Sequence, residues 1–160
     1  MGAFFKAIEF LITSERQTVD PIIPSTQLSL GKFRYSKRSL GNLHSADKKL
    51  QNLFYVVINR VDCTIIESYR NKTNQDKYFL DGKSKVKWPL SRHNSFPSKA
   101  IDVAPYPIEW HNTERFHNFA KIVIEEAKNL DINIRWGGDW NGNGDTTDQT
   151  FNDLCHWELK

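Results

Sequence analysis

The chain has 160 residues and a mass of 18.7 kDa, the size of one domain that can bury a hydrophobic core without disulfide bonds. Hydrophobic residues make up 39% and charged residues 26%, with five Trp and ten Phe, which excludes an intrinsically disordered chain. The net charge is only +3, no basic block alternates with aromatic residues, and no apolar run approaches the length of a membrane span. We therefore expect neither nucleic acid as a partner nor a membrane span.

The first 32 residues are expected to form an extension ahead of the main domain. Residues 1–12 are apolar but are interrupted by Lys6 and Glu9 and lack a basic start, which favours a short amphipathic helix over a signal peptide. Residues 13–32 contain two prolines, a glycine and several Ser and Thr, a composition typical of a linker. The main domain is then expected over residues 33–160.

Helices and short strands are predicted to interleave along the main domain. Helical spacing of apolar residues predicts helices over 46–60, 71–80 and 112–130, the first capped by Ser45 and the second ending at Gly82. Runs rich in β-branched or aromatic residues predict strands over 63–67, 100–104, 132–136 and 156–159. The order lacks a regular βαβ rhythm, so we predict an α+β fold, a small single domain with a mostly antiparallel sheet and flanking helices.

Two distant segments carry residues that are able to bind a metal. His93 precedes Asp102 on a predicted strand, and His156 begins the last predicted strand, three residues after Asp153. Catalytic zinc takes three protein ligands and leaves a fourth position for water, so two imidazoles, one carboxylate ligand and one carboxylate base suit a zinc hydrolase. Spacing alone does not establish the site, because ordinary surface or core histidines give the same pattern.

Several motifs in a fixed order extend this pattern. They are Ser91-x-His93, Pro97-Ser98-x-Ala100-x-Asp102, Ala104-Pro105-Tyr106, Trp136-Gly137-Gly138-Asp139-Trp140 and Asp153-x-x-His156-x-Glu158-Leu159. Over residues 33–160 the chain resembles the M15 family of zinc D,L- and D,D-peptidases, most closely its phage endolysin and VanY-like branch. The resemblance implies a Hedgehog/D-Ala-D-Ala-peptidase-like fold in which His93, Asp102 and His156 bind zinc.

The same resemblance assigns roles to three further side chains. Asp153 resembles the base that deprotonates the zinc-bound water, Ser91 the serine that helps to hold the substrate, and Arg70 the arginine that polarises the scissile carbonyl or clamps a carboxylate. One departure is the step from His93 to Asp102, which is nine residues instead of seven and lacks the motif glycine. Extra loop residues cost little when both ends are anchored, so this departure bears on the substrate-side shape more than on the metal.

The function that this resemblance implies is a zinc-dependent peptidoglycan peptidase, a phage endolysin that cuts stem peptides at the L-Ala–D-Glu bond. A D-alanyl-D-alanine carboxypeptidase with the same ligands and base is the alternative. From another class, a non-catalytic cell-wall-binding module with a structural metal also stays open. The lack of a recognised signal peptide fits synthesis in the host cytoplasm and later release to the periplasm and cell wall, and we expect a monomer.

One loop matches the opening of an EF-hand calcium site, with the candidate ligands Asp139, Asn141, Asn143 and Asp145. The match fails at position twelve, where Thr150 stands in place of a bidentate Glu, and Asp148 is the remaining substitute. A weak calcium site and an exposed Gly/Asn/Asp-rich turn therefore both stay open.

Other polar and aromatic residues are weighed as follows. Glu158 shares a face with His156, where it either orients that ligand or faces solvent, and Cys155 is expected to be a small core residue. Three tryptophans either floor a substrate groove or pack in the core: Trp136, Trp140 and Trp157. Three histidines have no motif around them and are not expected to be ligands: His44, His111 and His117.

Overall fold

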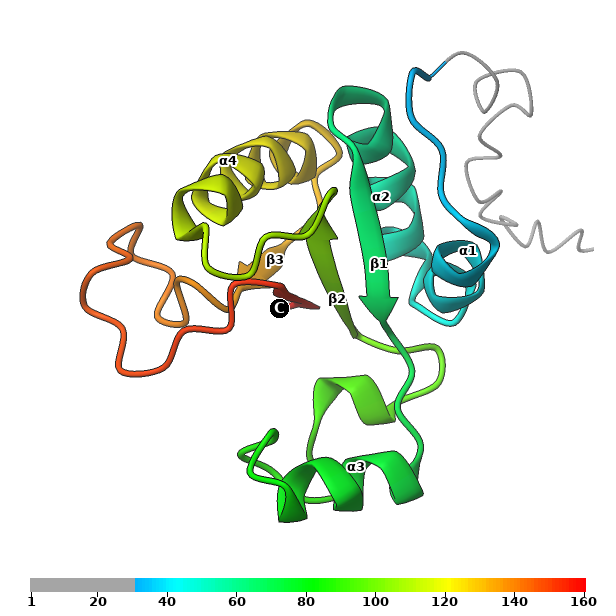
Figure 1. The fold of residues 1–160 in the computed structure, drawn as a ribbon, viewed down its shortest axis with the longest axis vertical. Helices are drawn as coiled ribbons and strands as arrows, with labels where there is room; N and C mark the ends of the chain where they lie inside the picture. Colours follow the sequence, from blue (N-terminus) through cyan, green and yellow to red (C-terminus); the bar gives the residue numbers. More distant parts are fainter. Residues whose placement is uncertain (1–30) are drawn as a thin grey trace, which may run out of the picture.

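The computed structural model describes residues 31–160, so the helix and most of the linker expected over residues 1–32 lie outside the described part of the chain. The elements, in chain order, are α1 (Lys37–His44), α2 (Lys48–Arg60), β1 (Cys63–Glu67), α3 (Lys72–Leu80), the 3-10 helix η2 (Arg92–Asn94), β2 (Ala100–Pro105), α4 (Thr113–Asn129), β3 (Ile134–Trp136) and β4 (His156–Leu159). Figure 1 shows helices gathered around one small sheet. The α+β prediction is confirmed.

The sheet places the last strand of the chain in its interior. The strand order is β1-β2-β4-β3, and every neighbouring pair is antiparallel. On β2, Ala100 is paired with Glu158 and Asp102 with His156. The carboxyl end of the chain therefore meets residues more than fifty positions earlier, at the centre of the sheet.

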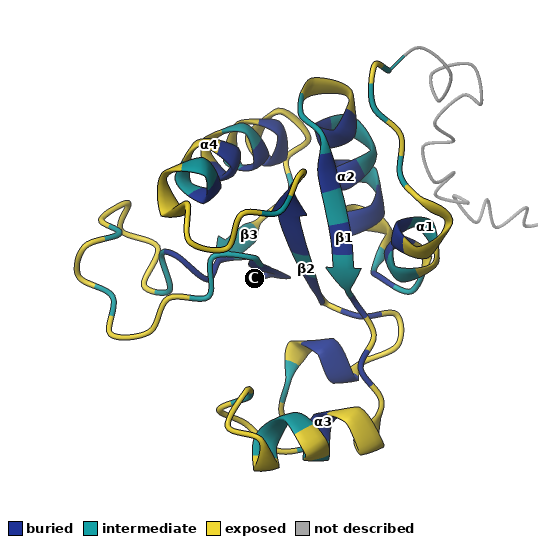
Figure 2. Cartoon of the chain, in the orientation of Figure 1, coloured by how far each residue is buried: buried dark blue, intermediate teal, exposed yellow. Residues whose placement is uncertain are grey.

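One face of the sheet is covered by α2 and α4, and it contains the core. Successive strand residues point to opposite faces, and Ile101, Val103 and Trp157, all fully buried, take the helix-covered side. Buried stretches of α2, α4 and β2 are dark blue in Figure 2. The Trp157 ring lies 6.4 Å from that of Phe54 on α2 and 6.3 Å from that of Phe119 on α4. The intervening residues of β2 and β4, Asp102 and His156 among them, are left on the other face.

Two details at the start of the domain differ from prediction. No helix is predicted between residues 13 and 45, yet α1 forms with Ser36 as its N-cap. Ser45 is the C-cap of α1 and not the N-cap of the next helix, which begins after Asp47, whose side chain accepts the Lys49 N–H at 2.9 Å. An eight-residue helix has too few apolar residues to show a clear helical period, so its caps are also misplaced.

The other predicted helices and strands are found within two residues of their expected ends. Trp136 and Trp157 belong to the core, where their rings stack with centroids 5.8 Å apart. Within residues 31–160, no helix is both long and apolar enough to cross a bilayer.

Candidate metal centre

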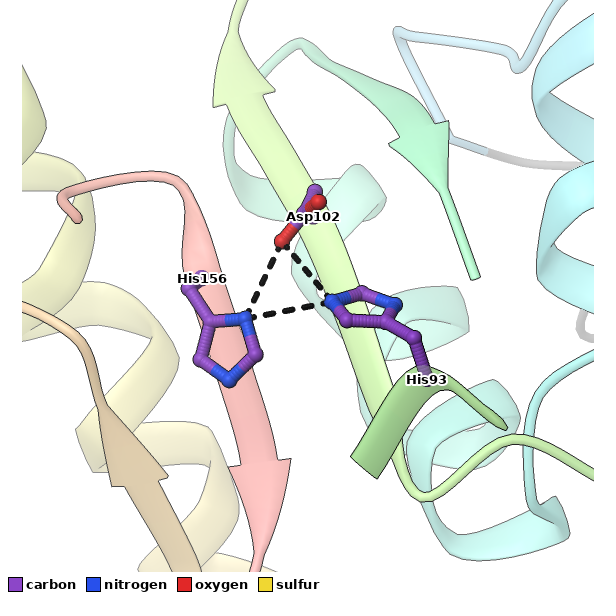
Figure 3. Close-up of side chains that lie close together, drawn as sticks. All are labelled: His93, Asp102 and His156. Atoms are coloured by element: carbon purple, nitrogen blue, oxygen red, sulfur yellow. Dashed lines mark hydrogen bonds and ion pairs between the residues drawn. The ribbon is translucent and has the colours of Figure 1, made fainter. Parts of the chain in front are cut away.

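Two of the predicted metal ligands lie side by side on the sheet face that the helices leave free. Asp102 on β2 is the direct antiparallel partner of His156 on β4, which brings the two side chains together. His93 comes from η2, and its ring points toward the other two side chains (Figure 3). The fold therefore unites the three residues that the sequence predicts as ligands.

The three potential ligand atoms form a nearly equilateral triangle. Asp102 Oδ1 lies 3.2 Å from His156 Nδ1 and 3.3 Å from His93 Nε2, and the two nitrogens are 3.2 Å apart (Figure 3). Tetrahedral zinc with bonds of about 2.0–2.1 Å holds its ligand atoms roughly 3.3 Å from one another. Among the described residues this is the single group of three or more His, Cys, Asp or Glu side chains that could hold an ion, and its dimensions fit zinc.

Hydrogen bonds fix which nitrogen of each imidazole is available to a metal. His93 Nδ1 lies 2.6 Å from the carbonyl oxygen of Ser68, so it donates its proton there, and Nε2 keeps a free lone pair. His156 Nε2 lies 3.0 Å from Glu158 Oε2, so it donates to that carboxylate and leaves Nδ1 free. Both free nitrogens point into the triangle, which is the arrangement that a shared cation requires.

A proton takes the place of the cation when no metal is bound. Burial lowers the pKa of His156, but hydrogen bonds to Asp102 and Glu158 outweigh that effect and raise the pKa to about 9. Burial alone would raise the pKa of Asp102, but its interactions with His93 and His156 hold that pKa well below the usual range of a carboxyl group. Metal binding at neutral pH must therefore displace a proton from His156.

Glu158 is the support of His156. Its side chain is 5% exposed, and its Oε1 accepts the Arg135 Nε–H at 3.0 Å. Burial raises the pKa of Glu158, but hydrogen bonds from His156 and Arg135 outweigh it, so the net pKa is lowered. Of the two alternatives for Glu158, the solvent-facing one is wrong, and its contact with His156 favours the orienting role. Arg135 is a residue that sequence reasoning misses, because only the β3–β4 register places it opposite Glu158.

Asp153 lies beside the triangle at the turn that leads into β4. Its backbone N–H donates to the Gly137 carbonyl at 2.9 Å, and a Cβ at Gly137 would stand 2.3 Å from the Asp153 carbonyl oxygen, so a glycine is required there. Burial and the negative charge of Asp102 raise the pKa of Asp153. Cys155 is not the core residue that was expected, because it is half-buried and its thiol donates to Asp153 Oδ1 at 3.3 Å.

Arg70 and Ser91 both lie at the site, each tied to one of the ligands. The Arg70 guanidinium donates to Glu67 Oε2 from Nε at 2.9 Å and from one terminal nitrogen at 2.6 Å, and it lies 3.6 Å from Asp102 Oδ2. Ser91 caps η2, where its Oγ accepts the backbone N–H of His93 at 3.2 Å. Glu67 carries no motif and emerges as a partner of Arg70 only in the fold.

An open cleft of about 460 Å³ exposes the triangle. One wall is formed by residues 83–86, 91 and 92, and the other by Trp140, residues 149–151 and Asp153. The ring of Trp140 lies 5.3 Å from that of His156. Of the three tryptophans, Trp140 is therefore the one whose position agrees with a role in a substrate groove. A cleft that ends on three converging polar groups is the usual form of an active site.

The lengthened step between His93 and Asp102 does not line this cleft. The loop is anchored at Ser98, whose backbone N–H donates to Ser45 O at 2.9 Å and whose carbonyl accepts the Asp47 N–H at 2.8 Å. Its tip carries Phe96, 74% exposed, which packs edge to face on Tyr69 with ring centroids 5.3 Å apart. None of residues 94–99 lines the described cleft, so an effect of this loop on the substrate side stays a prediction.

Comparison with known proteins agrees with this geometry. The family model described as phage L-alanyl-D-glutamate peptidase matches residues 31–160. The L-alanyl-D-glutamate peptidase of Escherichia phage T5 is 30% identical over 122 residues, which cover 73% of this chain and 88% of that protein. The chain belongs to the phage L-alanyl-D-glutamate peptidase family. The predicted M15 resemblance is confirmed.

The fold agrees with a solved structure as well. The crystal structure of the Serratia marcescens L-Ala D-Glu endopeptidase ChiX matches with a TM-score of 0.65 and 23% identity, covering 81% of this chain and 92% of that one. At this identity the match is evidence for the fold, and it confirms a small α+β domain. As a member of the phage peptidase family, the protein is a peptidase.

The predicted calcium loop of this peptidase folds around one carboxylate. Asp139 Oδ1 accepts the Gly142 N–H at 2.9 Å, and its Oδ2 accepts the Gly144 N–H at 2.9 Å. Both glycines have positive φ, 71° and 86°, which residues with a side chain rarely adopt. Asp148 is held by the amides of Asn141 and Asn143 at 2.9 and 2.8 Å. The loop is exposed, and calcium binding stays a prediction.

Proposed function

We propose that this protein is a zinc-dependent endopeptidase that hydrolyses the L-Ala–D-Glu bond of peptidoglycan stem peptides and serves a phage as an endolysin. The observation that carries the proposal is the group of His93, Asp102 and His156, which lies open to a cleft beside a carboxyl group with a raised pKa. The names of the family and of its phage T5 member support this choice of bond.

The metal would be held by His93 Nε2, Asp102 Oδ1 and His156 Nδ1. When bound, zinc would supply a Lewis acid that polarises the scissile carbonyl and makes water a better nucleophile at neutral pH. Ser68 and Glu158 keep the two imidazoles in the tautomers that present these nitrogens. These supports are in place before any metal binds, so little reorganisation is needed.

Asp153 is the proposed general base and acid. It would take a proton from the attacking water and pass it to the nitrogen of the leaving amine as the peptide bond breaks. Its raised pKa suits both steps, because a carboxylate of ordinary pKa is too weak a base to hold that proton between them. The Cys155 thiol donates to the same carboxylate and helps to fix its orientation.

Ser91 and Arg70 are proposed to hold and polarise the substrate. Ser91 Oγ accepts the backbone N–H of His93, so its own hydroxyl proton remains free to donate to a substrate carbonyl. Arg70 is engaged by Glu67, Gln75 and Asp102, which leaves it few free N–H groups. We therefore propose that it polarises the carbonyl oxygen and does not clamp a carboxylate.

The alternatives have weaker support. The matching family and its phage T5 member are named for the L-Ala–D-Glu bond, which favours the endopeptidase over the carboxypeptidase. A structural zinc site would usually have four ligands, most of them Cys, where this group has three and no Cys. The relation to phage enzymes supports release to the host cell wall. Synthesis in the host cytoplasm and a monomeric state are part of the same proposal.

Digestion of purified peptidoglycan tests the proposed bond. Mass spectrometry should find freed stem peptides that begin with D-Glu and glycan-linked L-Ala with a free carboxyl group. Loss of a terminal D-Ala alone would instead establish the carboxypeptidase. Metal analysis should find one zinc per chain, and His93→Ala should lose it, whereas full zinc content in that variant would refute the ligand set.

A further inference from the structure

One cationic side chain in the cleft has a guanidinium that donates no hydrogen bond among the described residues. Arg92 lines the wall beside the metal centre, and its side chain is 49% exposed. Within residues 31–160 its guanidinium donates no hydrogen bond, and the nearest carboxylate oxygen, Glu158 Oε1, is 3.9 Å away. A guanidinium carries five N–H donors in a planar fork, so Arg92 presents an unused binding group to the cleft.

Glu158 does not need Arg92 for its own charge balance. Its Oε1 already accepts from Arg135, with which it forms a close ion pair, and its Oε2 accepts from His156 at 3.0 Å. The ion-pair contact from Arg92 is longer than either. Arg92 therefore lies next to Glu158, which supports the metal ligand His156, but Glu158 does not depend on Arg92 for its position or charge.

The other cations that line the cleft have their nearest partners away from the metal centre or are buried. Arg70 is bound to Glu67, and its side chain is only 9% exposed. Lys85 lies over the Phe151 ring at 5.6 Å, and Lys83 lies 3.8 Å from Asp81. Of the four cations among the described residues that line the cleft, Arg92 is the exposed one whose nearest carboxylate, Glu158, belongs to the residues around the metal centre.

The proposed substrate carries an anion close to the bond that is cut. A D-Glu residue has two carboxyl groups, of which one continues the peptide and the other is free. The free group is either two or four covalent bonds from the scissile nitrogen, so it enters the cleft beside the metal centre whenever that bond is positioned for hydrolysis. Capping this group as a carboxamide removes its charge and leaves its shape almost unchanged.

We propose that Arg92 binds the free carboxylate of the D-Glu residue and makes the enzyme selective for substrates in which this group is not amidated. The proposal rests on the proposed function. An arginine fork pairs with a carboxylate through two parallel hydrogen bonds, whereas a carboxamide offers one oxygen and no charge. Arg92 is thus a specificity-determining residue of this cleft.

Two synthetic peptides that differ only in this group test the proposal. Both contain the L-Ala–D-Glu bond, and the free carboxyl group is either acid or carboxamide. We expect the wild-type zinc enzyme to show kcat/KM about 10- to 100-fold higher for the acid, the range of one charge-assisted interaction. In Arg92→Gln the ratio should fall to near one through loss of activity on the acid, and Arg92→Lys should give an intermediate ratio, because it keeps the charge without the fork.

Lys85→Gln is the matched control, because it removes one positive charge from the same cleft and should leave the ratio at its wild-type value. Zinc content and thermal unfolding of each variant show whether the metal centre and fold are intact. A wild-type ratio near one refutes the role of Arg92 while the proposed bond stands, even if the variants fail to fold. A ratio that collapses in Lys85→Gln and survives in Arg92→Gln also refutes it. Cleavage of neither peptide refutes the proposed function, and this inference falls with it.

Discussion

Removing the carboxylate of Glu158 should weaken zinc binding without touching a ligand atom. The two oxygens of this side chain serve different partners, Oε1 the Arg135 guanidinium and Oε2 the His156 Nε2–H. In Glu158→Ala, His156 loses its acceptor, and the Arg135 guanidinium loses its anion. His156 is then free to turn and to place its proton on Nδ1, the nitrogen that the metal needs.

The expected loss can be graded with two variants. Substitution of a group that supports a metal ligand typically weakens metal affinity by about 10- to 100-fold. Glu158 is 4% exposed, so little water can reach His156 to replace the lost carboxylate. We therefore expect Glu158→Ala to weaken zinc affinity by about 100-fold, the upper end of this range. Glu158→Gln keeps one acceptor oxygen, for which Arg135 and His156 must compete, and we expect a loss of about tenfold.

Competition with a chromophoric chelator measures these affinities at fixed pH. Glu126→Ala is a suitable control, because Glu126 is also buried and paired with an arginine, Arg60, but lies on α4 away from the metal centre. Zinc affinity of Glu158→Ala equal to that of the wild type, with an intact fold, would refute the orienting role of Glu158.

Three further predictions concern the base, the proton at the metal centre and the calcium loop. Asp153→Asn should lower kcat by about 100- to 10,000-fold while its zinc content stays unchanged. Cys155→Ala, which removes only the thiol that contacts Asp153, should lower kcat much less. Undiminished digestion of peptidoglycan by Asp153→Asn would rule out Asp153 as the base. In the chelator-treated protein the pKa of His156 is about 9, against 6.5 for the free side chain. The folded state therefore binds this proton more tightly than the unfolded state, and the resulting stabilisation is complete below pH 6.5. The free energy of unfolding in urea should therefore fall by on the order of 3 kcal/mol between about pH 6.5 and 9, and a flat profile would contradict the proton at His156. Calorimetric titration should show weak calcium binding that Asp139→Ala abolishes, and no heat together with no effect of calcium on activity would end that prediction.

The candidate ligands could be identified from the sequence, but not the residues that contact them. His93, Asp102 and His156 lie in motifs with a fixed order, and short strands rich in β-branched residues are recognisable from composition alone. Glu67 and Arg135 have no motif, because they reach the site through cross-strand pairing, and register is a property of the folded sheet. Each imidazole tautomer depends in the same way on an acceptor that is known only from the fold.

Loop geometry was the least predictable part of the site. The two extra residues before Asp102 suggested an altered substrate side, yet they form a tip around Phe96 that packs on Tyr69 outside the cleft. The cleft walls are formed instead by residues 83–86 and 149–151, which carry no motif. The position of residues 83–86 follows from side-chain contacts in the fold, such as the hydrogen bond that the Gln75 amide donates to Ser84 Oγ at 2.8 Å.

The charges around the metal centre explain why one arginine is left over. Three carboxylates surround the site, namely Asp102, Asp153 and Glu158, and a divalent metal together with Arg135 balances them when all are ionised. Arg70 and Glu67 neutralise one another outside this count. The charge of Arg92 is then unbalanced in the metal-bound enzyme, so an anionic group on the substrate completes the balance, whereas a neutral carboxamide leaves the guanidinium partly desolvated without a counter-ion.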